Sequence, residues 1–76
     1  MTDDRLNLDA VGLLCPLPVL KARKRLQALE AGECLTMRAD DPAAIVDVPH
    51  FCAEAGHDLV RQDLDGPVQT YVIRKG

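Results

Sequence analysis

The first half of the chain shows two hydrophobic periodicities in succession. Leu6 and Leu8 alternate with polar residues, which predicts a short strand over residues 5–9 with one buried face. Apolar side chains then recur at helical spacing, at Val19, Ala22, Leu26 and Leu29. This spacing predicts a helix over residues 17–30, which ends before Gly32 because glycine commonly terminates helices.

The second half begins with another alternation. Its apolar positions are Leu35, Met37 and Ala39. They predict a strand over residues 34–39 that buries this side and leaves Cys34 facing outward. Residues 40–42, Asp-Asp-Pro, offer an acidic cap and an N-terminal proline for a helix over residues 43–55. Pro49 lies inside that segment and removes one backbone amide, so we expect a broken or late helix start.

Two further strands complete the predicted order of elements. Residues 59–64 and the β-branched stretch 68–74 flank an Asp-Gly-Pro turn at 65–67. The order is strand, helix, strand, helix, strand, strand, or βαβαββ. Right-handed crossovers would place both helices on one face, and the final hairpin makes the last strand antiparallel to its neighbour. We therefore expect an α/β two-layer sandwich, with a mixed four-stranded sheet, as one domain over residues 1–76.

Composition narrows the classes of function. The chain has 76 residues, a net charge of −3 and only two aromatic side chains, Phe51 and Tyr71. Such a chain has few groups that could neutralise phosphates or stack on bases, so we expect no direct, tight nucleic-acid binding. A domain of this size has little room for a deep substrate cavity. Its chemistry should therefore take place at the surface or against a partner, with the protein as a monomer.

The cysteines and the apolar runs indicate a compartment. Cys15, Cys34 and Cys52 are odd in number and none lies in a Cys-x-x-Cys spacing, which favours a reducing environment. Residues 1–5 are acidic and lack the features of a secretory signal. The apolar run 11–20 is too short to cross a bilayer. We expect a cytoplasmic protein that is not in a membrane.

Other candidate chemistry is weak. His50 and His57 would share a helix face while Cys52 points away from it, so a metal site there is disfavoured. Cys34 and Cys52 lack a helix-start environment and should be passive thiols. The chain has no Gly-rich phosphate loop and no nucleophile elbow. We expect neither a metal nor a cofactor.

Cys15 is the strongest candidate for chemistry. It precedes Pro16, Leu17 and Pro18, where the first strand leads into the first helix. A cysteine at the N-cap would meet unpaired first-turn amides and the positive end of the helix dipole, so we expect a lowered thiol pKa. The two prolines would fix the backbone around it and leave the amides of Leu17 and Val19 to face the sulfur. The alternative is a buried cysteine that merely begins a helix.

A basic run follows this motif in an otherwise acidic chain. Its members are Lys21, Arg23, Lys24 and Arg25. Such a run is commonly a solvated helix face. The alternative is a docking surface for an acidic protein partner, which long-range electrostatic steering would assist.

Several segments together resemble one family. They are residues 8–18 with the element Cys15-Pro16-x-Pro18, then Ala39-Asp40-Asp41-Pro42-Ala43, Asp47-x-Pro49 followed by Phe51-Cys52, and Ile73-Arg74-Lys75-Gly76. They resemble the TusA family of sulfur-carrier proteins, also called SirA-like, over nearly the whole chain. The resemblance implies a βαβαββ domain that carries sulfur as a persulfide on Cys15 and is not an enzyme with its own turnover. Cys34 lies outside the family motif.

The resemblance also implies partners. Sulfur would arrive from a cysteine desulfurase and leave for a TusBCD-type or DsrE-like acceptor, on the way to 2-thiouridine in tRNA. The Cys15 thiolate would attack the donor persulfide and then be attacked by the acceptor cysteine. Two alternatives remain: the same carrier chemistry feeding sulfur oxidation or molybdenum-cofactor synthesis, and a thiol-based regulatory module. The regulatory module would need a resolving cysteine near Cys15.

Overall fold

The computed structural model describes residues 4–76 and shows the six predicted elements in the predicted order, preceded by one short turn that was not predicted. A short 3-10 turn, η1 (Asp4–Leu6), precedes β1 (Asn7–Ala10), α1 (Leu17–Gln27), β2 (Cys34–Ala39), α2 (Ala44–Ala55), β3 (Asp58–Asp63) and β4 (Gln69–Arg74). The predicted βαβαββ order is confirmed. The start of the chain, interpreted above as lacking a secretory signal, lies outside the described residues at positions 1–3.

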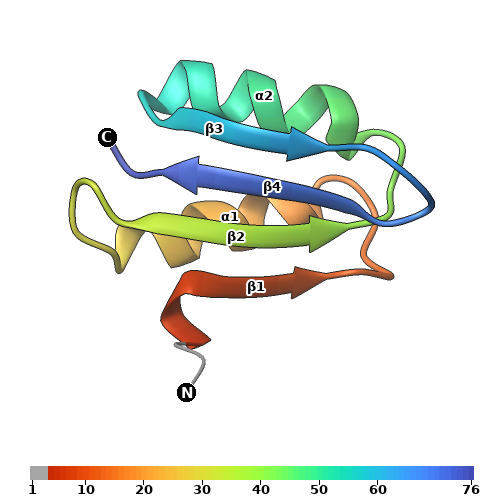
Figure 1. Cartoon of the computed structure of the whole chain (residues 1–76), viewed down its shortest axis with the longest axis horizontal. Coiled ribbons are helices and arrows are strands. Elements are labelled where there is room, and N and C mark those ends of the chain that lie inside the picture. Colours follow the sequence, from red (N-terminus) through yellow and green to blue (C-terminus); the bar gives the residue numbers. More distant parts are fainter. Residues whose placement is uncertain (1–3) are drawn as a thin grey trace.

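The four strands form one mixed sheet in the order β1-β2-β4-β3. β1 pairs with β2 in parallel, whereas β4 runs antiparallel to both β2 and β3. Both helices lie behind the sheet in Figure 1, so the predicted two-layer arrangement is confirmed. The carboxyl ends of β1 and β2 point to the same edge, where the loops that lead into α1 and α2 lie side by side (Figure 1). That edge positions the candidate site.

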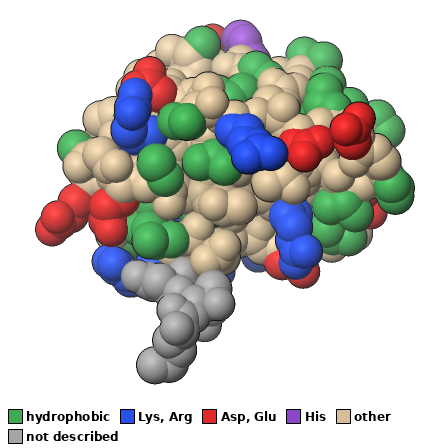
Figure 2. All heavy atoms as spheres, in the orientation of Figure 1, with side chains coloured by type: hydrophobic (Ala, Val, Ile, Leu, Met, Phe, Trp, Pro, Cys, Tyr) green, Lys and Arg blue, Asp and Glu red, His purple; other side chains and the backbone are tan. Residues whose placement is uncertain are grey.

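The core lies between the sheet and the helices. Leu35, Met37 and Ala39 of β2 are fully buried, so the predicted alternation holds. The buried side chains that meet them come from both helices and from β4: Ala22, Leu26, Val48, Phe51, Cys52, Tyr71 and Ile73. Cys34 lies on the opposite side of β2 and is partly exposed. Figure 2 shows this outer face of the sheet, where acidic and basic side chains lie among scattered hydrophobic ones.

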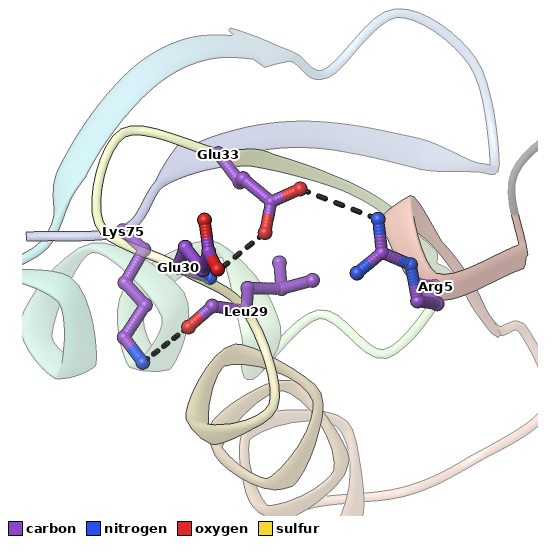
Figure 3. Close-up of polar contacts among 5 residues, drawn as sticks. All are labelled: Arg5, Leu29, Glu30, Glu33 and Lys75. Atoms are coloured by element: carbon purple, nitrogen blue, oxygen red, sulfur yellow. Dashed lines mark hydrogen bonds and ion pairs between the residues drawn. The ribbon is translucent and has the colours of Figure 1, made fainter.

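α1 ends earlier than the hydrophobic spacing predicted. After Gln27 the amides of Ala28 and Leu29 bond three residues back, to Arg25 and Leu26, so the last turn tightens. The carbonyl of Leu29 accepts from Lys75 Nζ at 2.6 Å (Figure 3). Side chains from other parts of the chain thus satisfy the helix end.

A polar cluster beside this helix end holds the α1–β2 loop (Figure 3). Glu33 accepts from the amide of Glu30 at 2.8 Å and pairs with Arg5 at 3.4 Å. Arg5 belongs to η1, whose 3-10 conformation explains why β1 starts at Asn7 and not at residue 5. This cluster therefore joins the N-terminal turn to the loop before β2.

α2 corrects one expectation. It is one helix from Ala44 to Ala55 with Pro49 inside it, so the broken or late start predicted from that proline is wrong. An internal proline costs about 3 kcal/mol. Val48 and Phe51 are buried on the core side, and burying such side chains contributes about 1.5–3 kcal/mol each. Packing against the sheet therefore offsets the missing hydrogen bond.

Candidate functional site

Cys15 lies in the loop between β1 and α1 and is exposed. The predicted N-cap position is wrong by one residue: Pro16 is the N-cap and α1 begins at Leu17. The amide of Leu17, expected to face the sulfur, donates to the carbonyl of Leu14 at 2.9 Å. The Leu17 amide is therefore not available to stabilise a Cys15 thiolate in the way that the sequence predicted.

The thiol instead contacts a carboxylate from the second helix. Cys15 Sγ donates to Asp47 Oδ2 at 3.0 Å. Asp47 is the fourth residue of α2, and its own amide donates to the carbonyl of Ala43 at 2.9 Å. The helix backbone therefore places the carboxylate at the thiol.

The electrostatics of the site reverse the expected pKa direction. The hydrogen bond to Asp47 raises the pKa of the Cys15 thiol, and partial desolvation and the charges of Asp47 and Asp41 act in the same direction. The predicted lowering of this pKa is wrong. The physical reason is that the hydrogen-bonded carboxylate of Asp47 and the nearby charge of Asp41 both disfavour the thiolate.

Asp41 holds the backbone of the reactive loop. The amide of Cys15 donates to Asp41 Oδ2 at 2.6 Å, and the amide of Ala43 donates to Asp41 Oδ1 at 3.2 Å. Asp41 is only 9% exposed, whereas its exposed neighbour Asp40 accepts from the amide of Gly12 at 2.9 Å. The two aspartates thus fasten the β1–α1 loop to the β2–α2 loop.

A buried chain of hydrogen bonds continues from Asp41 into the core. The carbonyl of Asp41 accepts from Gln69 Nε2 at 3.1 Å, and Gln69 Oε1 accepts from the hydroxyl of Tyr71 at 2.7 Å. Gln69 and Tyr71 both lie on β4 and are buried. Sequence reasoning interpreted Asp41 only as a helix start and missed Asp47 and Gln69 as parts of the site. The sole signal for Asp47 was its place in the family resemblance.

The prolines of the motif have separate surroundings. The Cys15–Pro16 peptide bond is cis, and Pro16 lines an open groove beside the thiol. Pro18 is the second residue of α1 and is buried, next to Ala44 at the start of α2. Pro16 therefore shapes the surface at the thiol, while Pro18 helps to pack the two helices together beneath it.

The groove runs from Cys15 along the space between α1 and α2 and has a volume of about 430 Å³. Besides Cys15 and Pro16 it is lined by Val19, Arg23, Asp47, His50, Phe51, Glu54 and Ala55. His50 Nε2 lies 3.1 Å from Glu54 Oε1 at its exposed rim. The groove is open to solvent and shallow, so it offers a surface against which a partner can lie.

The basic run does not form one surface. Arg23 lines the groove beside the thiol, whereas Lys21, Lys24 and Arg25 lie on the side of α1 that faces Leu8 of β1. Arg25 Nη1 also donates to the carbonyl of Asn7 at 2.6 Å. The helical spacing of three and four residues explains this division.

The other cysteines have different surroundings from Cys15. Cys52 is buried, and burial raises the pKa of its thiol to about 11. Cys34 is partly exposed on the outer side of β2, opposite Arg74 of β4. Over residues 4–76 no group of three or more metal-ligating side chains could hold a metal ion, and no helix is long and apolar enough to cross a membrane.

Comparisons with known proteins agree on one family. The model of the family described as Sulfurtransferase TusA matches residues 6–75. The crystal structure of a SirA-like protein from Desulfitobacterium hafniense is similar at 29% sequence identity and a TM-score of 0.80. That match covers 92% of this chain and 96% of the other.

Proposed function

The chain belongs to the TusA family, whose members act as sulfur carriers and not as classical enzymes, and on this premise we propose that Cys15 is the residue that carries the sulfur. The observation that supports this assignment is that its exposed thiol lines the groove. Cys52 is buried, and Cys34 lies on the far side of the sheet from the helices. Cys15 is therefore the thiol that a second protein can reach within a shaped surface.

The proposed reaction needs no cavity and no cofactor. Cys15 attacks the terminal sulfur of a persulfide on a cysteine desulfurase, and the donor cysteine leaves as a thiol. The cysteine of a TusBCD-type or DsrE-like acceptor then attacks the terminal sulfur on Cys15 and restores the free thiol. Sulfur moves without net oxidation, so a reducing compartment, the cytoplasm, suits the three free cysteines.

Both partners must dock around the same thiol in turn. Leu14 and Val46 adjoin Cys15 and Asp47 in sequence and are 70% and 71% exposed. They offer apolar contact beside the thiol. Lys21 and Lys24 form the basic side of α1, and we assign to them the electrostatic attraction of an acidic partner surface. Arg23 would contact the partner from within the groove.

The end use that the family resemblance favours is 2-thiouridine formation in tRNA. Delivery to sulfur oxidation or to molybdenum-cofactor synthesis would use the same chemistry at Cys15. The genes next to this one distinguish the pathways, because tRNA-thiolation partners and a rhodanese with DsrE-like proteins belong to different clusters. A redox switch is disfavoured, since Cys34 and Cys52 are not placed to act as a resolving thiol.

Mass spectrometry tests the carrier role. Incubation with a cysteine desulfurase and cysteine should add one sulfur atom to the wild-type chain, located on the peptide that contains Cys15. Cys15→Ser should abolish loading, while the matched variants Cys34→Ser and Cys52→Ser should keep it. Loading that persists in Cys15→Ser would overturn the assignment.

A further inference from the structure

We propose that Asp47 accepts the thiol proton when Cys15 attacks, so that the carrier reacts as a hydrogen-bonded thiol–carboxylate pair and not through a free thiolate. The proposal deepens the function proposed above and rests on it for the identity of the donor. It assigns a catalytic role to a residue of the second helix, 32 positions away in sequence from the cysteine.

The contact has the geometry of proton transfer. Cys15 Sγ and Asp47 Oδ2 are 3.0 Å apart, and the thiol is the donor. The carboxylate is held by the start of α2, and the loop that carries the thiol is held by Asp41 through the Cys15 amide. The backbone of each partner residue is therefore fixed by a hydrogen bond before any donor arrives.

The charges around the thiol leave little free thiolate. Asp47 and Asp41 both raise the pKa of Cys15. The other charged or titratable groups of the groove are Arg23 on α1 and the pair His50 and Glu54 on α2. Because these carboxylates disfavour the thiolate, we expect the Cys15 proton to leave as the new bond forms.

The step balances without an added oxidant or reductant. A lone pair of Cys15 Sγ forms the bond to the terminal sulfur of the donor persulfide, and the S–S bond of the donor breaks. The electron pair of that bond goes to the donor cysteine sulfur. The Cys15 proton moves to Asp47 Oδ2 and is then passed to the departing donor thiolate, which restores the carboxylate.

A protonated resting thiol also has a protective consequence. Oxidation to sulfenic acid follows thiolate character and exposure, and Cys15 is exposed. Asp47 suppresses the free thiolate but supplies the acceptor for its proton when an electrophilic sulfur is in place. The thiol–carboxylate pair therefore allows Cys15 to react with a docked persulfide donor while it slows the reaction of Cys15 with dissolved oxidants.

The pH dependence of sulfur acceptance tests the proposal without any partner protein. The probe is glutathione persulfide, used with the full chain carrying Cys34→Ser, and loading of Cys15 is followed by mass spectrometry. Each rate is divided by the protonated fraction of the probe at that pH, taken from a separate titration of the probe, because the persulfide anion is a poor electrophile. A pair that shares one proton reacts at a rate that changes little with pH until the second proton leaves. We expect a nearly flat rate from about pH 6 to pH 8 in this background.

Asp47→Asn should convert the profile to that of a single thiol. Its rate should rise about tenfold per pH unit below the thiol pKa, because only free thiolate then reacts. Glu54→Gln is the matched control, since Glu54 lines the same groove without contacting the sulfur, and it should keep the flat profile.

The profile of the Cys34→Ser background decides the question even if Asp47→Asn does not fold. A rise of about tenfold per pH unit in that background would mean that free thiolate is the nucleophile, and the proposal would be overturned. Loading of Cys15 by the persulfide with a flat profile would support Asp47 as the proton acceptor. If desulfurase loading fails while this small-molecule result holds, the carrier role is wrong and the chemistry of the pair stands.

Discussion

Replacing Asp41 by alanine should loosen the reactive loop and destabilise the domain more than the same change at Asp40. The two aspartates are adjacent, and each accepts the amide of a residue in the β1–α1 loop. Asp41 is buried and also accepts from Ala43, whereas Asp40 is exposed and accepts only the Gly12 amide among the contacts of the described chain. The pair therefore offers a perturbation with a matched control.

The magnitude follows from the two lost hydrogen bonds. Hydrogen bonds to a charged group contribute about 1.5–3 kcal/mol each. Because Cys15 is exposed, water can replace part of the loss at its amide, so we expect Asp41→Ala to cost about 2–4 kcal/mol of unfolding free energy. A domain of this length loses about 4–8 °C in Tm per kcal/mol. Asp40→Ala, with one solvent-exposed bond, should cost less than about 1 kcal/mol.

Urea unfolding followed by circular dichroism measures both variants, with an unchanged m-value as the sign that only stability has changed. The same samples report on the loop through the rate of Cys15 alkylation by iodoacetamide. Asp41→Ala should raise that rate, because one of the charges that raise the thiol pKa is gone. Equal stability losses for Asp40→Ala and Asp41→Ala would refute the assignment of Asp41 as the anchor.

Two further predictions concern the basic side of α1 and the buried thiol. Lys24→Glu should slow sulfur transfer from a desulfurase by about threefold to tenfold at low ionic strength, and high salt should remove the difference. Arg61→Glu on β3 changes the net charge equally and serves as the control. Equal slowing by both variants would contradict a specific docking surface on α1. Burial raises the pKa of the Cys52 thiol from 9.0 to about 11. Because the folded state favours the neutral thiol, the contribution of Cys52 to the free energy of unfolding is complete below pH 9 and is lost as pH rises toward 11. The free energy of unfolding should therefore fall over this pH range, and Tyr71, whose pKa is also raised by burial, should contribute to the fall. Cys52→Ala should make this decrease with pH less steep. An equally steep decrease in the variant would contradict the role of Cys52.

The sequence predicted the fold because its local patterns agree with the tertiary arrangement. Leu35, Met37 and Ala39 alternate in the sequence and are all buried in β2. The element boundaries were less predictable, since they depend on distant side chains. α1 ends at Gln27, and in the turn that follows Glu33 accepts from the Glu30 amide and Lys75 donates to the Leu29 carbonyl. The local sequence around Gln27 does not predict either contact.

The electrostatics of the candidate site were less predictable than the choice of Cys15 as its candidate residue, which stays a prediction. The Cys-Pro-x-Pro element indicated Cys15 as the candidate, but the expected lowering of its pKa assumed that the nearest polar groups belong to the same helix. Asp41 and Asp47 come from the following loop and helix, and parallel pairing of β1 with β2 places them at the thiol. Sequence spacing cannot show this, because the contacts span 26 and 32 residues.

A carrier must release sulfur as readily as it accepts it, and this requirement favours the thiol–carboxylate pair over a low-pKa thiolate. A thiolate of low pKa leaves easily when an acceptor attacks its persulfide, but it is a weaker nucleophile toward the donor. A thiol of raised pKa is the better nucleophile once deprotonated and the poorer leaving group. Asp47 would remove this conflict by taking the proton of the attacking acceptor thiol and passing it to Cys15 Sγ as the sulfur departs. The same contact of 3.0 Å would then act as proton acceptor in loading and proton donor in unloading.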